Sequence, residues 1–288
     1  DKVFAGELRY PNPGEPVPVV SGAQSCLPFR DLPSPVFDGL HLRQYGEPGH
    51  LPIMASRGCY WAKCAFCSYP MYEPKYEVRS QQKLEQDIKQ LAQKYGARQL
   101  AFADPSISPV LARRIARIVT QSQHPVTWSG FTRFDSDFTA DVLKEMADGG
   151  CTVLHWGLES GCVRIQSMLN KGTNLFLAAE ILKNASATGI HNRLLMMYGL
   201  PTEGTDDSLE SLRFVEENTE SVGSIHWTRY AAEEGTVLSK NHGRECGCQQ
   251  DLASGLPVPG VLSSVIHDHQ SARIAVVARL HRKQEGRG

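Results

Sequence analysis

Several features that would place this chain in a specialised class are missing from its 288 residues. No apolar run reaches the roughly 18 residues that a membrane-spanning helix needs, and the start carries no secretory signal pattern. A net charge of −1 predicts no basic surface of the kind that binds nucleic acid or an anionic membrane. We therefore expect a cytoplasmic protein with no nucleic-acid partner and no membrane partner.

Cysteine is also too scarce for a disulfide scaffold, because the eight residues are few and unevenly placed. Three of them, Cys59, Cys64 and Cys67, lie close together. Such clustering in a chain without a secretion signal favours metal binding over disulfide formation. Cys246 and Cys248 form a second pair, whose spacing is too unspecific to define a role.

What the sequence does contain is an alternation of short apolar runs and amphipathic segments. Strands alternating with helices pair in parallel through crossover connections, so the fold class is α/β. The expected strands are 53–56, 99–103, 126–131, 152–157, 193–198 and 224–228, and the expected helices are 82–95, 109–121, 139–149, 162–169, 175–188 and 208–217.

Composition divides the chain into three parts. Residues 1–50 carry eight prolines and predict an irregular arm or linker. Residues 51–230 hold the βα alternation, and residues 231–288 form a loop-rich tail with a final helix at 264–284. The chain begins with Asp1 rather than Met, and we expect a further domain upstream of the arm.

The cysteine cluster follows the first expected strand. In parallel α/β folds the functional site lies at the carboxyl ends of the strands, so the cluster falls where a site is expected. Three thiolates leave a metal site one ligand short. A structural zinc ion requires a fourth ligand, whereas an iron–sulfur cluster held by three leaves one iron open. Both interpretations fit the cysteines alone.

The cysteine loop on the first of six βα units resembles the radical S-adenosylmethionine (radical SAM) family, whose hallmark ends in Cys-x-aromatic-Cys. Cys64-Ala-Phe66-Cys67 matches it. The resemblance implies a partial (β/α)6 barrel, a [4Fe–4S] cluster on Cys59, Cys64 and Cys67, and SAM bound beside Phe66. Four residues separate Cys59 from Cys64 where the family usually has three, and we interpret this as the mark of a subgroup.

Downstream motifs extend the resemblance at successive strand ends. Asp104 follows the second strand, where relatives carry an acidic turn near the SAM amino group. Arg133 lies in an Arg-x-Asp turn after the third strand, and the resemblance pairs it with the SAM carboxylate or with Asp135. Each also has a plain structural interpretation: Asp104 as a helix cap, and Arg133 as the partner of its neighbouring aspartate.

The fourth and fifth strands end in the two strongest of these motifs. Gly157-Leu-Glu159-Ser160 matches a segment whose glutamate accepts hydrogen bonds from the SAM ribose, a role that suits an acceptor-only carboxylate. Gly199-Leu-Pro201-Thr-Glu203 resembles the turn on the adenine side of the SAM pocket. Arg193 begins the fifth strand, where a cofactor contact and a surface charge are equally expected.

Two histidines, on the fourth and the sixth expected strands, are not expected to be ligands. His155 and His226 lie in apolar segments, and a histidine in such a position is more often a satisfied core residue than a ligand. We therefore predict that both belong to the core.

The order of motifs is most similar to the radical SAM class associated with an N-terminal cobalamin-binding domain. These 288 residues contain no Asp-x-His-x-x-Gly cobalamin signature, so a domain absent from this chain would supply cobalamin. The resemblance implies an enzyme that cleaves SAM reductively and methylates or otherwise modifies a small-molecule or peptide substrate, with an electron donor such as flavodoxin or ferredoxin. An oxidoreductase or a peptide-modifying maturase is the other kind of enzyme that the resemblance allows. The alternative is a structural zinc or iron–sulfur protein, or a degenerate member that no longer cleaves SAM.

Overall fold

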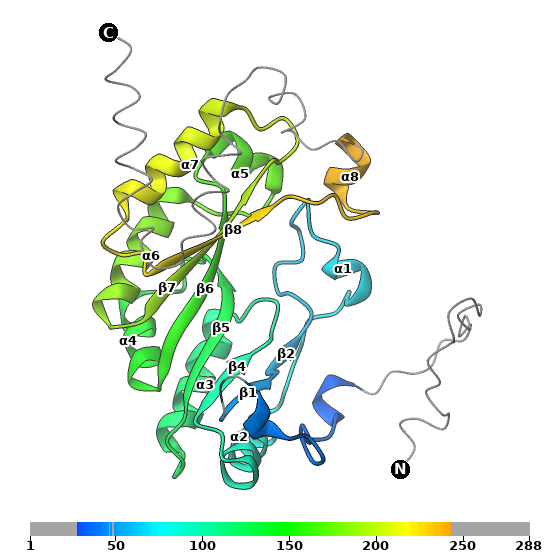
Figure 1. The fold of residues 1–288 in the computed structure, drawn as a ribbon, viewed down its shortest axis with the longest axis vertical. Helices are drawn as coiled ribbons and strands as arrows, with labels where there is room; N and C mark the ends of the chain where they lie inside the picture. Colours follow the sequence, from blue (N-terminus) through cyan, green and yellow to red (C-terminus); the bar gives the residue numbers. More distant parts are fainter. Residues whose placement is uncertain (1–27, 46, 48, 243–288) are drawn as a thin grey trace, which may run out of the picture.

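A computed structural model describes residues 28–45, 47 and 49–242. Its centre is a six-stranded parallel sheet in the order β1-β4-β5-β6-β7-β8, which Figure 1 shows running through the molecule. Each added strand pairs with the one before it, as expected of successive βα units. Within the described residues the sheet does not close, so the predicted partial barrel is confirmed as an open one.

The strands of the sheet are β1 (His50–Ile53), β4 (Gln99–Phe102), β5 (Thr127–Arg133), β6 (Cys151–Glu159), β7 (His191–Tyr198) and β8 (Ser224–Arg229). The longer helices are α2 (Gln81–Tyr95), α3 (Pro109–Gln121), α4 (Ala140–Asp148), α5 (Val163–Leu169), α6 (Leu175–Ala187) and α7 (Thr205–Glu217). Short elements complete the described chain: η1 (Phe29–Asp31), η2 (Leu42–Gln44), α1 (Tyr69–Tyr72), α8 (Val237–His242) and the antiparallel pair β2 (Ser56–Arg57) and β3 (Glu77–Val78).

Local sequence signals place the helix boundaries. The Ser108 and Thr139 side chains accept hydrogen bonds from the backbones of Leu111 and Val142 and so cap α3 and α4. Pro109 occupies the first turn of α3, where its missing N–H costs nothing. Gly96 ends α2 in the left-handed conformation with φ 67°.

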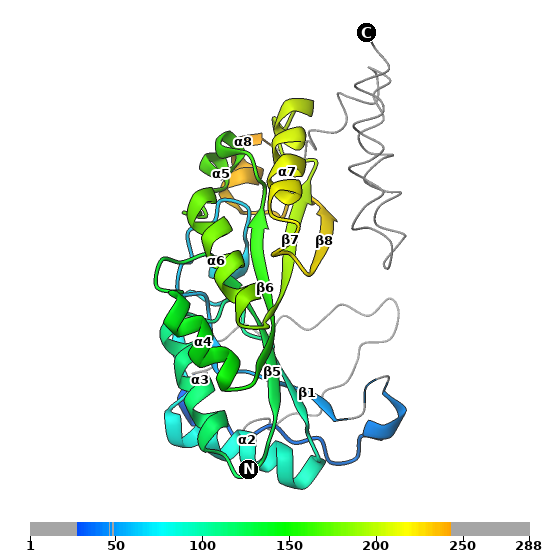
Figure 2. The same cartoon turned by 90° about the vertical axis from the view of Figure 1, so that its left-hand side faces the viewer.

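Helices α3, α4 and α6 lie against one face of the sheet (Figure 2). The strands send alternate side chains to that face, and Trp128, Trp156 and Leu194 are fully buried there. Phe134 stacks on the Trp156 indole with 4.9 Å between ring centroids. The opposite face of β5 to β8 therefore carries the other half of the alternation, and in the described structure Phe131, Arg193 and His226 are exposed on it.

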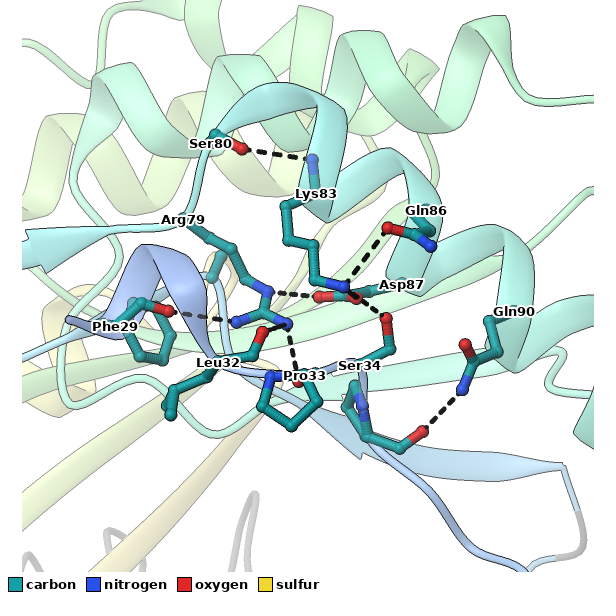
Figure 3. Close-up of polar contacts among 12 residues, drawn as sticks. Phe29, Leu32, Pro33, Ser34, Arg79, Ser80, Lys83, Gln86, Asp87 and Gln90 are labelled. Atoms are coloured by element: carbon teal, nitrogen blue, oxygen red, sulfur yellow. Dashed lines mark hydrogen bonds and ion pairs between the residues drawn. The ribbon is translucent and has the colours of Figure 1, made fainter. Parts of the chain in front are cut away.

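A buried arginine makes the largest set of contacts between the proline-rich arm and the sheet domain (Figure 3), beside single hydrogen bonds from Lys83 to Ser34 and from Gln90 to Pro35. Arg79 pairs with Asp87 on α2, and both side chains are almost fully buried. The same guanidinium donates to the backbone carbonyls of Phe29, Leu32 and Pro33. Residues 28–35 are thus held against the domain, a contact that the sequence did not predict.

The first strand differs from its predicted position. We expected it at 53–56, whereas β1 ends at Ile53 and Ser56 begins the separate β2. The strand starts early because the Gly49 carbonyl already accepts from the backbone N–H groups of Arg98 and Gln99. The expected helix 264–284 and the pair Cys246 and Cys248 lie outside the described residues.

Among the described helices, none combines the length and apolar character that crossing a bilayer would require.

Candidate functional site

The cysteine loop leaves the end of β1 through β2 and is framed by the β2–β3 pair. Gly58 has φ 82°, and a Cβ there would lie 2.2 Å from the Lys75 carbonyl oxygen, so this close approach requires glycine. The thiols of Cys59, Cys64 and Cys67 are all free and half-buried. The loop therefore presents three unpaired thiols at the carboxyl edge of the sheet.

The three thiols lie within electrostatic reach of one another. Burial raises the pKa of Cys64 to about 11, the positive Lys171 opposes this rise, and the neighbouring thiolates of Cys67 and Cys59 add to it. Burial likewise raises the pKa of Cys67. Without a bound cation both thiols are therefore protonated at neutral pH, and a metal that binds them would have to displace those protons.

The arrangement of these donors bears on which metal group they suit. In the described part of the chain, no three His, Cys, Asp or Glu side chains lie close enough together to hold a single metal ion. Zinc needs all its ligands at about 2.0–2.3 Å from one point, whereas a [4Fe–4S] cluster takes each thiolate on a different iron. Three free thiols on one loop are the type of donor that an iron–sulfur cluster takes.

The additional residue between Cys59 and Cys64 is accommodated by contacts on both sides. Ala62 adopts φ 52°, in the left-handed region. The Trp61 indole N–H donates to the Asn170 carbonyl at 3.0 Å, and the Asn170 side chain donates to the Lys63 carbonyl at 2.9 Å. The Trp61 ring also lies on Gly172, where a Cβ would meet it at 2.6 Å. The longer spacing thus forms a loop that is bound to the segment after α5.

Asp104 lies directly behind the start of this loop. Its carboxylate, fully buried, accepts hydrogen bonds from the backbone N–H groups of Ala55 and Ser56 and from the Ser56 hydroxyl at 2.6 Å. Burial raises the pKa of Asp104 to about 6, and the three donors oppose that rise. In this structure Asp104 therefore positions the backbone that leads to Cys59.

Arg133, at the end of β5, connects several parts of the site and is 6% exposed. It donates to Asp135 at 3.1 Å and to the Lys171 carbonyl at 2.7 Å. Its guanidinium lies over the Trp61 ring at 4.1 Å. The Arg133 Nε is buried and finds no acceptor in the described part of the chain. One donor thus remains for a ligand, while Asp135 takes the pairing that the sequence offered as an alternative.

Glu159, the last residue of β6, faces the cysteine loop. The Lys171 ammonium lies 2.5 Å from its carboxylate, and the two side chains are only 12% and 10% exposed. Glu159 also has φ 68°, a strained backbone for a residue with a side chain. A Cβ at Gly157 would come within 2.3 Å of Lys171 Nζ, so the motif glycine makes room for this pair.

Lys171 is the site residue that sequence reasoning missed. It follows α5 in an Asn-Lys-Gly turn that has no motif of its own, and it influences the pKa values of Cys64 and Cys67 as well as pairing with Glu159. Only the three-dimensional arrangement brings it to the cysteines.

Three further predicted residues, Phe66, Gly199 and Pro201, lie at the same edge of the sheet. Gly199 turns with φ 73° after β7, and the Glu203 carboxylate closes that turn by accepting from the Leu200 N–H at 2.9 Å. Pro201 is buried within it. Phe66 packs against the same small core that contains Leu200. The cysteine loop and the Gly199–Glu203 turn therefore share one hydrophobic cluster.

The remaining two predicted residues point elsewhere. The Ser160 hydroxyl is fully buried, 3.0 Å from the Ser211 hydroxyl, and accepts from the Cys162 N–H at the start of α5. Arg193 is the third residue of β7 and lies far from the Gly199 turn. The structure thus brings together the cysteines, Arg133, Glu159 and the β7 turn, with Arg193 nearer the amino end of the sheet.

The chain as a whole is similar to one family of known proteins. The family model described as the radical SAM superfamily matches residues 53–215. A relative from Pyrococcus horikoshii, named uncharacterized methyltransferase PH0819, is 26% identical over 190 residues, which are 64% of this chain and 41% of that protein. The chain therefore spans less than half the length of this relative.

Two solved structures share the fold. The cobalamin-dependent S-adenosylmethionine radical enzyme OxsB, with aqua-cobalamin and S-adenosylmethionine bound, matches with a TM-score of 0.60 and 15% identity over 83% of this chain and 46% of its own. The radical S-adenosylmethionine methyltransferase TsrM from Kitasatospora setae, with cobalamin and a [4Fe–4S] cluster bound, matches with a TM-score of 0.57 and 17% identity over 66% of this chain and 36% of its own.

Proposed function

Because this chain belongs to the radical SAM superfamily, we propose that it binds a [4Fe–4S] cluster through Cys59, Cys64 and Cys67 and cleaves SAM reductively. When bound and reduced, the cluster supplies the electron that cleaves SAM into methionine and a 5′-deoxyadenosyl radical, which abstracts a substrate hydrogen. The observation that carries the proposal is the set of three free thiols on one loop at the carboxyl edge of the sheet, opposite Glu159.

The surrounding residues have separate tasks in this proposal. The Arg133 Nε, buried without an acceptor among the described residues, donates to the SAM carboxylate. Glu159 accepts from the ribose hydroxyls and exchanges part of its pairing with Lys171 for them. The Gly199–Glu203 turn presents backbone to the adenine, and Phe66 excludes water beside the cluster. Asp104 holds the loop backbone in place.

We further propose that the reaction is methyl transfer to carbon in a small-molecule or peptide substrate, with an electron donor such as flavodoxin or ferredoxin. The Pyrococcus relative is named a methyltransferase, and the two solved structures of like fold are cobalamin enzymes. In this proposal residues 51–230 form the radical SAM core, residues 1–50 link it to a cobalamin-binding domain outside this chain, and residues 231–288 contribute to substrate binding.

Anaerobic reconstitution with iron and sulfide tests the first step. The protein is expected to bind four irons and four sulfides per chain and to release 5′-deoxyadenosine from SAM when dithionite is added. Cys64→Ala is expected to lose both properties. Cys151→Ala is the matched control, since Cys151 is buried at the opposite end of β6. Stoichiometric zinc with no deoxyadenosine would contradict the proposal and support the structural alternative.

Methyl transfer is tested separately with SAM carrying a deuterated methyl group, with and without added cobalamin and the upstream domain. Mass spectrometry is expected to find the label in a product only when cobalamin and that domain are present. Deoxyadenosine without any labelled product would retain the radical SAM assignment and remove the methyl transfer.

A further inference from the structure

The face of the sheet opposite helices α3, α4 and α6 carries an unusual set of side chains. Across four strands, Phe131, His155, Arg193 and Ser224 stand side by side in register. His226 stands in the next row toward the carboxyl ends, beside Leu195. We expected His155 and His226 in the core, and this was wrong. His226 is exposed and His155 is half-buried on the open face, because alternation sends Trp156 rather than His155 to the helices.

The ionisable side chains in this row and the rows beside it are all basic. Burial is the main cause that lowers the pKa of His155 to about 4, and the nearby Arg193, His191 and His226 add to it. The rows that contain His191, His155 and His226 include no acidic residue on β5 to β8 in the described chain. The Arg193 guanidinium is exposed, and within residues 28–242 as described its one hydrogen bond goes to the Ser224 hydroxyl, at 3.3 Å. Its charge therefore has no carboxylate partner in the described structure.

An apolar surface lies beside these cations. The Phe131 ring is 40% exposed, and one of its faces stacks on the His155 ring with centroids 4.5 Å apart and planes 27° apart. A flat apolar surface next to a few convergent polar groups is the composition of a small-molecule site. The row lies two residues below the level of Gly157, which is about 7 Å along the strands.

From these observations we infer that the open face of β5 to β8 binds the anionic group of a small organic acid, with Arg193 as its principal ligand. His155 and His226 donate hydrogen bonds to the same group, and Phe131 packs on the carbon skeleton. The inference rests on the proposed function, since it places the far end of the bound acid toward Glu159 and the cysteine loop. A guanidinium fork matches a carboxylate or a phosphate, and either serves as the recognised group.

Phenylacetate, phenyl phosphate and the neutral phenylacetamide are suitable probes, titrated into the full 288-residue chain by calorimetry. One or both of the anions are expected to bind about tenfold more tightly than phenylacetamide. The amide lacks the negative charge that the Arg193 guanidinium would hydrogen-bond. The stronger of the two identifies the head group as carboxylate or phosphate. Equal binding of the amide, or no binding of either anion, would overturn the inference.

Arg193→Gln is expected to weaken anion binding about tenfold, and Arg193→Lys to weaken it less, because lysine keeps the charge but not the fork. Arg213→Gln is the matched control, since Arg213 is exposed on α7, away from this row. Equal weakening by Arg213→Gln would show a general charge effect and remove the site.

The parent protein supplies a readout that does not depend on any variant folding. Anion binding is expected to shift the ring signals of His155 and His226 in NMR spectra and to leave His124, after α3, unchanged. A shift of all three together would count against a site. These titrations need neither reductant nor SAM cleavage, so anion binding without deoxyadenosine would remove the proposed function alone. Deoxyadenosine without anion binding would remove only the site.

Discussion

The Lys171 ammonium and the Glu159 carboxylate form a 2.5 Å ion pair with both side chains nearly buried. A buried pair is worth little net stability while it is intact, but the removal of one partner leaves an uncompensated charge. Lys171 comes from the turn after α5 and Glu159 from the end of β6, so the pair also joins two segments that surround the cysteine loop.

Replacement of Lys171 should therefore cost more than replacement of both residues. Lys171→Met is expected to lower the free energy of unfolding by about 3 kcal/mol, and the double variant with Glu159→Gln to recover most of that loss. Urea unfolding of the apo chain measures the free energy of unfolding of the single variant and of the double variant. Additive effects of the two substitutions would contradict the coupling of these residues.

A second prediction concerns the arm. Arg79 pairs with Asp87 and also donates hydrogen bonds to three backbone carbonyls within residues 29–33. Arg79→Met is expected to cost about 3–5 kcal/mol, because it leaves Asp87 buried without its main partner and the carbonyls without donors. Limited proteolysis of the variant is expected to cut within residues 28–38 earlier than in the parent.

Lys94→Met is the control for that variant. Lys94 also binds the arm, through Asp38 at 2.6 Å, but both side chains are about half exposed. Lys94→Met is expected to leave the midpoint of urea unfolding unchanged within error, because the loss of a surface ion pair commonly costs little stability. Equal losses from the two variants would show that the arm is held by charge alone and not by the buried arginine.

The order of elements could be read from the sequence because periodicity and capping are local. Pro109 and Thr139 mark helix starts that the structure reproduces. The position of β1 could not be predicted from the sequence, because it depends on the pairing of Gly49 with residues 98 and 99, which are far away in the sequence. The sequence also did not predict that Arg193 and His155 share the sheet face away from the helices. Alternation along a strand divides its side chains into two sets but does not say which set faces the helices.

The candidate site divides in the same way. The predicted residues Glu159 and Gly199 lie at one edge of the sheet, because Glu159 is the last residue of β6, Gly199 follows β7, and parallel strands bring their ends together. Lys171 carries no motif, and its role appears only once the turn after α5 meets the cysteine loop. Ser160 belongs to a motif, yet its hydroxyl accepts a hydrogen bond from the Cys162 N–H at the start of α5 and contacts the Ser211 hydroxyl. A motif therefore located the site without assigning the task of each side chain.

Trp61 should determine how well the cysteine loop protects a bound cluster. Its indole donates to the Asn170 carbonyl and lies under the Arg133 guanidinium, contacts that together are worth on the order of 1–3 kcal/mol. Trp61→Ala is expected to speed the loss of cluster absorbance in air several-fold, and Trp61→Phe, which keeps a ring, to give an intermediate rate. Tyr72→Ala, an exposed aromatic on α1, is the control and should match the parent.

Asp104 gives a prediction about pH with a definite sign. Its pKa is raised from 3.8 to about 6 in the folded chain, so between those values the folded state holds a proton that the unfolded state has released. The contribution of Asp104 to stability is therefore largest below pH 4 and falls as the pH rises through 6.

The test compares the free energy of unfolding of the parent with that of Asp104→Asn at each pH from 4 to 7.5. Groups common to both proteins cancel in this difference, so it isolates the titration of Asp104. The stability advantage of the parent is expected to shrink by up to about 3 kcal/mol between pH 4 and pH 6.5 and to stay constant above that. An advantage that grows with pH would mean that the hydrogen bonds from Ala55 and Ser56 outweigh burial and keep Asp104 ionised.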